Sequence, residues 1–247
     1  MPDLKESLGY RYLQETKFSR ETIMSRPRPR VGPGAQFKVY DRAPVFELPD
    51  PQGLEVFLSD VLQSRRSRRT YASRTVTREQ VGALLWAAQG VTAMAGRLKL
   101  RTSPSAGGLY PVETYAVIQN VTGIPPGLYH LNVRDWCLEQ LQQGDFSARV
   151  AQAGLGQGFM AQAGLNVIWT SILRRNMAKY GHRGLRYVFL DAGHICQNLL
   201  LAAEALSLGA CAVGAFFDDE LNALLDLDGQ EESVIYSASV GVLGREG

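Results

Sequence analysis

The chain is poor in the residues that build disulfides and metal sites. Among its 247 residues there are only three cysteines, Cys137, Cys196 and Cys211. They lie far apart and form no CxxC pair, which argues against a disulfide framework and fits a reducing compartment. The three histidines are His130, His182 and His194. Their spacing is not that of metal ligands, so we expect no metal site.

Long apolar runs and an excess of one charge are also lacking. No stretch of eighteen apolar residues exists, so the sequence predicts no membrane-spanning helix. A formal net charge of +2 gives no global field that would attract nucleic acid or an anionic membrane. The polar beginning, MPDLKESLGYRYLQET, does not form a signal peptide. We therefore expect a cytoplasmic protein that binds neither nucleic acid nor membrane.

The composition, 45% hydrophobic and 20% charged, is that of an ordinary globular protein, and 247 residues are enough for one large domain or two small ones. Residues 1–53 hold too few apolar residues for a core of their own, and the stretch SRPRPRVGPG forbids regular structure. A short helix is predicted over 4–16 and an edge strand over 44–49, bounded by prolines. We predict an N-terminal arm over 1–53, which wraps the domain or a partner subunit, and one domain over 54–247.

The stretch from Leu185 to Leu208 is predicted to be the central helix. It is rich in Ala and Leu, and its apolar residues go almost all the way round, which predicts burial on most sides. A chain of this size has little material to wrap such a helix completely. We therefore expect one side to meet a second subunit, the alternative being a helix fully wrapped by its own chain. The helix is predicted to stop at Gly209, ahead of a buried strand over 211–216.

The remainder of the domain is predicted to combine helices with antiparallel strands. A capping box at Thr77 opens a helix that stops at Gly90, and a polar loop follows it. Strands are expected over 112–119, 128–133, 136–141, 165–173 and 233–242. Glycines near residue 156 do not have the spacing of a dinucleotide-binding fingerprint, which we reject.

A dense cluster of hydrogen-bond donors follows the first helix of the domain. It reads Arg65, Arg66, Ser67, Arg68 and Arg69. Guanidinium groups match phosphate oxygens and the serine hydroxyl adds one more donor, which favours phosphate binding. The alternatives are a solvated basic turn and a nucleic-acid contact. The lack of a further basic patch and of interleaved aromatic residues disfavours the nucleic-acid contact.

Two other segments, 104–108 and 174–184, are considered as parts of a site. The small residues of 104–108, PSAGG, let backbone amides approach a ligand closely, although a plain turn before the next strand is the alternative. A polar segment over 174–184 precedes the central helix and contains Lys179 and Tyr180. From the residues alone, these two are a surface charge and a packing residue.

Taken in order, these motifs resemble the FMN-dependent nitroreductase superfamily, and within it the azoline dehydrogenases of the SagB/ThcOx type. The matching stretches are RRSRRTY at 65–71, PSAGGLYPVETY at 104–115, GLYHL at 127–131 and KYGHRGLRYVFLDAGHICQNLLLAAEALSLG at 179–209. The resemblance covers about residues 54–244. It implies an α+β nitroreductase-like fold, with a central, mostly antiparallel sheet, surrounding helices and the long buried helix at a homodimer interface.

The resemblance also implies a set of site residues. Those that correspond to the grip on the FMN phosphate and ribityl chain are Arg65, Arg66, Ser67 and Arg69. Those that correspond to a loop reaching the flavin from the partner subunit are Pro104, Ser105, Ala106 and Gly107. Those that correspond to the turn against the isoalloxazine, and to a C-terminal basic residue at the phosphate, are Val213, Gly214 and Arg245. The implied catalytic pair is Lys179 and Tyr180.

The implied reaction suits this pair. Oxidation of a thiazoline or oxazoline to the azole removes a hydride, which flavin N5 accepts, and a proton, which a base such as tyrosine or lysine accepts. The implied substrate is a peptide or small molecule that carries an azoline, with a cyclodehydratase as candidate partner. Two alternatives stay open: an NAD(P)H-dependent reductase of nitroaromatics or quinones on the same fold, and a non-catalytic flavin-binding subunit of a modification complex.

We expect the purified protein to be yellow and to hold FMN rather than FAD. The arginine-serine cluster is sized for one terminal phosphate, and no dinucleotide fingerprint is present. Absorbance of the protein and chromatography of the released flavin measure this. A colourless protein that takes up no FMN in a binding titration contradicts the expectation.

Overall fold

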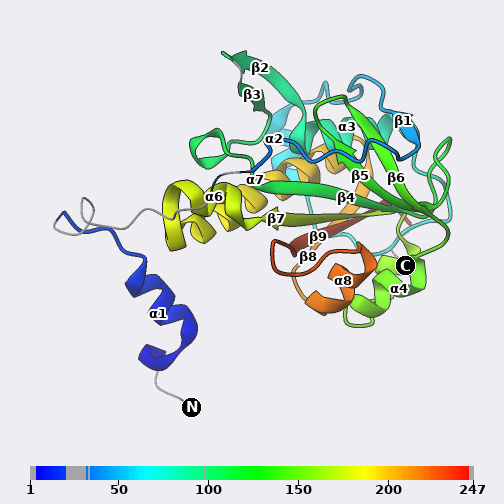
Figure 1. Cartoon of the computed structure of the whole chain (residues 1–247). Coiled ribbons are helices and arrows are strands. Elements are labelled where there is room, and N and C mark those ends of the chain that lie inside the picture. The colour runs from blue at the N-terminus through cyan, green and yellow to red at the C-terminus, as the bar shows by residue number, and fades with distance from the viewer. Residues whose placement is uncertain (1–3, 21–31, 33, 97, 245–247) are drawn as a thin grey trace.

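The computed structural model describes residues 4–20, 32, 34–96 and 98–244, and its centre is a seven-stranded sheet (Figure 1). The strand order is β1-β6-β5-β4-β7-β9-β8, and its ladders run antiparallel. The strands are β1 (Val45–Glu47), β4 (Val112–Ile118), β5 (Gly127–Asn132), β6 (Cys137–Gln143), β7 (Leu165–Ile172), β8 (Leu208–Val213) and β9 (Glu232–Val242). The predicted α+β fold with an antiparallel sheet is confirmed.

Helices cover both faces of this sheet: α3 (Arg78–Gln89) and α7 (Gly184–Ala205) cover one face, and α4 (Ser147–Ala153), α5 (Phe159–Gln162) and α8 (Asp218–Leu224) cover the other. The other α-helices of the described residues are α1 (Leu8–Glu15), α2 (Leu58–Ser64) and α6 (Leu173–Tyr180). Successive residues of a strand point to opposite faces. Accordingly, Trp169 of β7 packs in a core with α3 and α7, whereas Ile168 packs in a second core with α4 and α8.

The capping box predicted at the start of α3 is present in the structure. Thr77 Oγ1 accepts from the backbone amide of Gln80, and Gln80 Oε1 accepts from the amide of Thr77, which completes the capping box. The prediction of a polar loop after Gly90 is wrong, because β2 (Val91–Ala95) and β3 (Leu98–Arg101) form a separate hairpin there. β2 is mostly exposed, so its sequence lacks the alternation that a buried face imposes.

The end of the central helix also differs from its prediction. α7 ends at Ala205, and the left-handed residue that follows is Ser207, with φ 56°. Gly209 lies inside β8, where a Cβ would come within 2.8 Å of Leu243 Cδ2. Close packing, rather than a helix stop, therefore requires this glycine. The polar segment ahead of α7 is also helical, as α6.

One side of α7 is not covered by the part of the chain that the structure describes. Phe189 is 54% exposed and Leu190 is 58% exposed, although most of the apolar residues of this helix are buried. Nearby, a groove of about 350 Å³ with a largely apolar lining runs between α2, α3 and α7. No helix in the described part of the chain is long and apolar enough to cross a membrane.

Part of the N-terminal arm joins the sheet. β1 pairs with β6 at the sheet edge, as predicted for a strand between prolines, and Leu48 is buried in the core beneath α3. Earlier in the arm, α1 is held near the start of α7, where Arg183 Nη1 donates to the carbonyl of Thr16 at 2.7 Å. The domain limit at residue 53 stays a prediction.

A buried charge network crosses the middle strands. His130, which is fully buried, bonds through Nδ1 to Glu139 at 2.8 Å and through Nε2 to Glu113 at 3.2 Å. Burial opposes the charge of His130, but its bonds with the two carboxylates outweigh burial and raise its pKa. Burial likewise opposes ionisation of Glu113, and the bond from His130 and the charge of Arg175 lower the pKa of that carboxyl.

We expect His130→Gln to destabilise the protein most between about pH 4.5 and 6.5. The raised pKa of His130 contributes stability that is fully present below 6.5 and is lost as pH rises through the folded pKa. The lowered pKa values of Glu113 and Glu139 contribute stability that is present above 4.5 and is lost as pH falls through their folded pKa values. Removing one partner from a buried charge pair costs about 3–5 kcal/mol.

Urea denaturation at pH 5.5 and at pH 9 measures this difference, with the exposed His182→Gln as the matched control. An equal loss of unfolding free energy at both pH values would contradict the charge network.

Candidate flavin site

The arginine-serine cluster lies along the outer edge of β8. Ser67 forms a bridge with Ala210, whose carbonyl accepts from the amide of Arg68 at 2.9 Å. Burial raises the pKa of the Cys211 thiol, while the charge of Arg69 and a bond from Ser67 partly offset this, so both residues lie beside this cysteine. The backbone of the cluster thus lies beside β8, the strand at this edge of the sheet.

Two guanidinium groups of this cluster, those of Arg66 and Arg69, belong to exposed residues. Arg66 is exposed, and its Nη1 donates only to the nearby carbonyls of Gln63 and Arg65, at 3.0 and 2.8 Å. Arg69 is also exposed and lies over the ring of Phe159. Within the described residues, no carboxylate lies at ion-pair distance from Arg65, Arg66 or Arg69. Such a concentration of positive charge suits an anion.

The end of β8 belongs to the same region. Val213 is buried, and its carbonyl accepts from Ser237 Oγ at 3.2 Å, which fixes the end of the strand. Gly214 follows it at the surface and packs beside Tyr236. The predicted residues 65–69 and 213–214 therefore lie along one strand, β8, with the basic cluster beside its middle and the exposed Gly214 directly after its end.

The loop 104–108 is held to the central helix by Asp191. Ser105 Oγ donates to Asp191 Oδ2 at 2.6 Å and accepts from the amide of Tyr110 at 2.9 Å, while the amide of Ala106 donates to Asp191 Oδ1 at 3.3 Å. Asp191 is only 4% exposed, and burial raises the pKa of its carboxyl despite these bonds. Since its single O–H is given to Asp191, the hydroxyl of Ser105 has no proton left to offer a ligand.

Lys179 and Tyr180 lie against this loop in the same chain. A Cβ added at Gly107 would come within 2.6 Å of Tyr180 Oη and 2.7 Å of Lys179 Nζ, so the ends of both side chains lie close to this glycine. Gly107 also has φ 66°, which favours glycine. The ring of Tyr180 packs edge-on against Tyr187, with centroids 4.7 Å apart. Lys179 Nζ and Tyr180 Oη therefore both lie beside Gly107 of the loop.

A buried arginine connects the loop to the helix that carries this pair. Arg175 of α6 is 3% exposed, and its Nη1 donates to the carbonyl of Tyr110 at 3.0 Å and pairs with Glu113 at 2.6 Å. Its Nε donates to the carbonyl of Ala35 in the arm. Lys179 is four residues further along α6, which is about one helical turn.

The structure therefore gathers the predicted residues into two groups. One lies along β8, and the other joins the loop 104–107 to Lys179 and Tyr180. Arg245 lies outside the described residues. Sequence reasoning missed Asp191 and Arg175 as supports of the second group. The available signals were a carboxylate near the middle of a mainly apolar helix and a basic residue one turn before Lys179.

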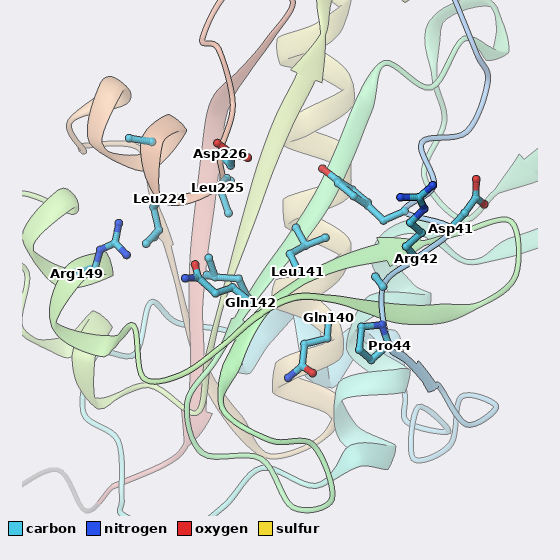
Figure 2. A pocket seen from close by; sticks show the side chains of 14 residues that line it. Asp41, Arg42, Pro44, Gln140, Leu141, Gln142, Arg149, Leu224, Leu225 and Asp226 are labelled. Carbon is cyan, nitrogen blue, oxygen red and sulfur yellow. The ribbon is translucent and has the colours of Figure 1, made fainter.

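A larger open cavity, of about 1000 Å³, lies elsewhere and holds none of the predicted residues (Figure 2). Segment 40–44 of the arm, β6, α4 and α8 form its walls, and Arg42 and Arg149 lie on opposite sides of it.

Comparison with known proteins gives a consistent match. The model of the nitroreductase family matches residues 62–242. The protein named "Putative nitroreductase MJ1384", from Methanocaldococcus jannaschii, is 37% identical over 182 residues, which are 74% of this chain and 89% of that protein.

Two further similarities cover less of the other protein. Trifolitoxin-processing protein TfxB of Rhizobium leguminosarum is 31% identical over 137 residues, which are 53% of this chain and 37% of TfxB. The crystal structure of a putative nitroreductase from Anabaena variabilis superposes with a TM-score of 0.76 at 26% identity and covers 95% of this chain. This chain spans 47% of the Anabaena chain.

We expect Asp191→Ala to loosen the loop 104–108 without unfolding the sheet. Hydrogen bonds to a charged group contribute about 1.5–3 kcal/mol, so the amides of Ala106 and Tyr110 should exchange about tenfold to a hundredfold faster. Hydrogen exchange followed by mass spectrometry measures this, with the exposed Asp218→Ala as the control. Unchanged exchange in the loop would show that other contacts hold it.

Proposed function

Because the chain belongs to the nitroreductase family, we propose that it is an FMN-dependent oxidoreductase that oxidises azolines to azoles. The observation that carries this proposal is the meeting of Lys179 and Tyr180 at Gly107. A lysine amine and a tyrosine hydroxyl are both groups that accept protons in enzymes. Removal of a proton from carbon distinguishes azoline oxidation from simple electron transfer through a flavin.

The residues present fit FMN. The exposed guanidinium groups of Arg66 and Arg69 suit its terminal phosphate, and the exposed Gly214 follows β8, the strand beside which the cluster lies. When bound, FMN supplies a two-electron acceptor for the hydride. The loop 104–107 offers backbone groups rather than the hydroxyl of Ser105, whose proton goes to Asp191.

In this proposal Lys179 and Tyr180 have the catalytic roles. Tyr180 or Lys179 takes the proton from the carbon next to the one that loses hydride, and the Lys179 ammonium group, 5.4 Å from the centre of the Tyr180 ring, supplies positive charge beside it. Tyr187 holds the tyrosine ring edge-on, and Gly107 holds both functional atoms close together. Asp191 and Arg175 fix the surrounding loop and helix.

We further propose a peptide-borne substrate, a cyclodehydratase partner and a homodimer. The similarity to TfxB, a trifolitoxin-processing protein, supports a role in modifying another molecule. The uncovered side of α7, with Phe189 and Leu190 exposed, supports association with a second copy. Large apolar residues left at the surface in this way are typical of an interface.

The name of the archaeal relative favours a second candidate, an NAD(P)H-dependent reductase of nitroaromatics or quinones. That reaction passes electrons through the flavin and deprotonates no carbon, so it has no need of Lys179 and Tyr180. Assays of the parent protein with a thiazoline peptide, and with NADPH and a nitroarene, distinguish the two. Fast nitroarene reduction without azoline oxidation would favour the second candidate.

We expect Arg66→Ala to weaken FMN binding about tenfold to a hundredfold, because a charge-assisted contact to phosphate contributes roughly 1.5–3 kcal/mol. Folding should be unaffected, since the Arg66 side chain is exposed. Flavin fluorescence titration of the apoprotein measures the affinity. Arg42→Ala, an exposed arginine at the other end of the sheet, is the matched control. Parent-like affinity of the Arg66 variant would remove Arg66 from the phosphate site.

We expect Lys179→Ala and Tyr180→Phe to keep FMN but to lose azoline oxidation. Loss of a general base costs about a hundredfold to ten-thousandfold in rate. Stopped-flow reduction of the bound flavin by a thiazoline peptide measures the step, and NADPH-driven quinone reduction should be spared. Tyr187→Phe keeps the ring packed against Tyr180 and serves as the matched control. Azoline oxidation at the parent rate in both variants would exclude the dehydrogenase mechanism.

A further inference from the structure

We infer that the N-terminal arm positions Lys179 and Tyr180, because it holds the chain on both sides of this pair. The inference rests on the proposed function. It assigns Thr16, Arg183 and Arg186 as positioning residues, which act on the pair through its neighbours. The arm, which lies far from the pair in the sequence, thereby influences proton transfer at the candidate site.

The pair occupies a helix end, which is a weakly held place. Lys179 and Tyr180 are the last two residues of α6, and helix ends fray. The next residue, Gly181, has φ 57°, so the chain leaves the helix directly after Tyr180. Gly107 lies beside the tips of both side chains. Contacts at side-chain tips do not by themselves fix the backbone of a helix end, so other contacts must set its position.

Before the pair, the arm contacts the first turn of α6. Arg175 Nε donates to the carbonyl of Ala35 at 2.9 Å, while Nη1 of the same buried guanidinium pairs with Glu113 of β4. Beside this contact, a Cβ added at Gly34 would lie 3.3 Å from Arg174 Cδ. This end of α6 is therefore fixed between the arm and the sheet.

After the pair, the end of α1 contacts the segment that leads into α7. α1 has no basic residue in its own last turn, and two arginines of that segment supply donors to its carbonyls. Arg183 Nη1 donates to the carbonyl of Thr16 at 2.7 Å, and Arg186 Nη2 donates to that of Leu13 at 2.6 Å. Arg186 Nε donates to Thr16 Oγ1 at 2.8 Å. Donors with positive charge stabilise the C-terminus of a helix.

Arg183 connects this contact to the ring of Tyr180. Its guanidinium donates through Nη1 to the arm and through Nε to the hydroxyl of Tyr187 at 2.9 Å. The ring of Tyr187 packs edge-on against that of Tyr180, with centroids 4.7 Å apart. Arg183 also follows Tyr180 closely in the chain. The position of Tyr180 therefore depends on α1 both through the backbone and through the ring contact.

α1 is otherwise independent of the folded body. None of its residues is buried, and none belongs to either hydrophobic core, whereas Thr16 at its C-terminus is only 1% exposed. Figure 1 shows α1 clear of the sheet, at the end of the molecule where α6 lies. A change that melts α1 should therefore leave the sheet and the Arg65–Arg69 cluster intact, which separates positioning from folding.

The first test compares Leu13→Pro with Leu8→Pro. Proline inside a helix removes a hydrogen bond and clashes with the preceding turn, so Leu13→Pro should melt α1. Leu8 occupies the first helical position, where proline is tolerated. Ser7, ahead of it, already has the extended backbone that a following proline requires. The two variants thus make the same exchange in one helix, with and without breaking it.

We expect Leu13→Pro to speed amide exchange over residues 180–187 about tenfold or more, because charge-assisted hydrogen bonds are lost. The kcat of azoline oxidation should fall about tenfold to a hundredfold, since a misplacement of about 1 Å can cost that much. The KM, the FMN affinity and NADPH-driven nitroarene reduction should stay at their parent values. Leu8→Pro should match the parent in every measurement.

The second test changes one oxygen of the arm. Thr16→Val keeps the shape of the side chain but removes the acceptor of Arg186 Nε, whereas Thr16→Ser keeps that acceptor. We expect Thr16→Val to lower kcat and to speed exchange over 180–187 by about threefold to tenfold. Thr16→Ser should restore most of both.

Exchange over 180–187 and kcat at parent values in a Leu13→Pro protein whose α1 amides exchange fast would overturn the inference. So would equal losses in Thr16→Val and Thr16→Ser, because the hydrogen bond would then be irrelevant. If the parent oxidises no azoline, exchange alone decides. Faster exchange over 180–187 in Leu13→Pro, but not in Leu8→Pro, would leave the positioning by the arm standing while the proposed reaction fails.

Discussion

The buried guanidinium of Arg175 joins the parts of the molecule on which the candidate site depends. It pairs with Glu113 of the sheet and donates to the carbonyls of Tyr110 and Ala35, so α6, β4, the loop and the arm meet at one side chain. A charge with 3% exposure is tolerated only with such partners. Glu113 in turn bonds to His130, which extends the network across β5 to β6. The position of α6, which carries Lys179 and Tyr180, thus depends on electrostatics in the middle of the sheet.

Glycine supplies the second constraint, because it lets polar side chains approach the backbone closely. At Gly107 the absence of a Cβ allows an amine and a hydroxyl to reach the same point. Asp191 holds that point from the other side by accepting from Ser105 and Ala106. A loop fixed on both sides is preorganised, and preorganised groups lose little freedom when a substrate binds.

Periodicity and capping signals were enough to predict most of the fold. The all-round apolar pattern predicted α7, and the capping box at Thr77 predicted the start of α3. The strand β2 is mostly exposed and has no buried face, so its sequence pattern did not predict a strand. The site residues came mainly from a resemblance, and the register of four strands, which no local pattern encodes, separates them into two groups. Long-range contacts such as Asp191 to Ser105 are invisible in sequence spacing.

The central helix α7 has two apolar surfaces. α7 is apolar on the side that packs on the sheet, and it is also apolar where Phe189 and Leu190 are exposed. A helix that only filled a core would gain nothing from the second surface. A helix that also contacts a second copy, as in the proposed homodimer, has a use for both surfaces, because one stabilises the subunit and the other forms the interface.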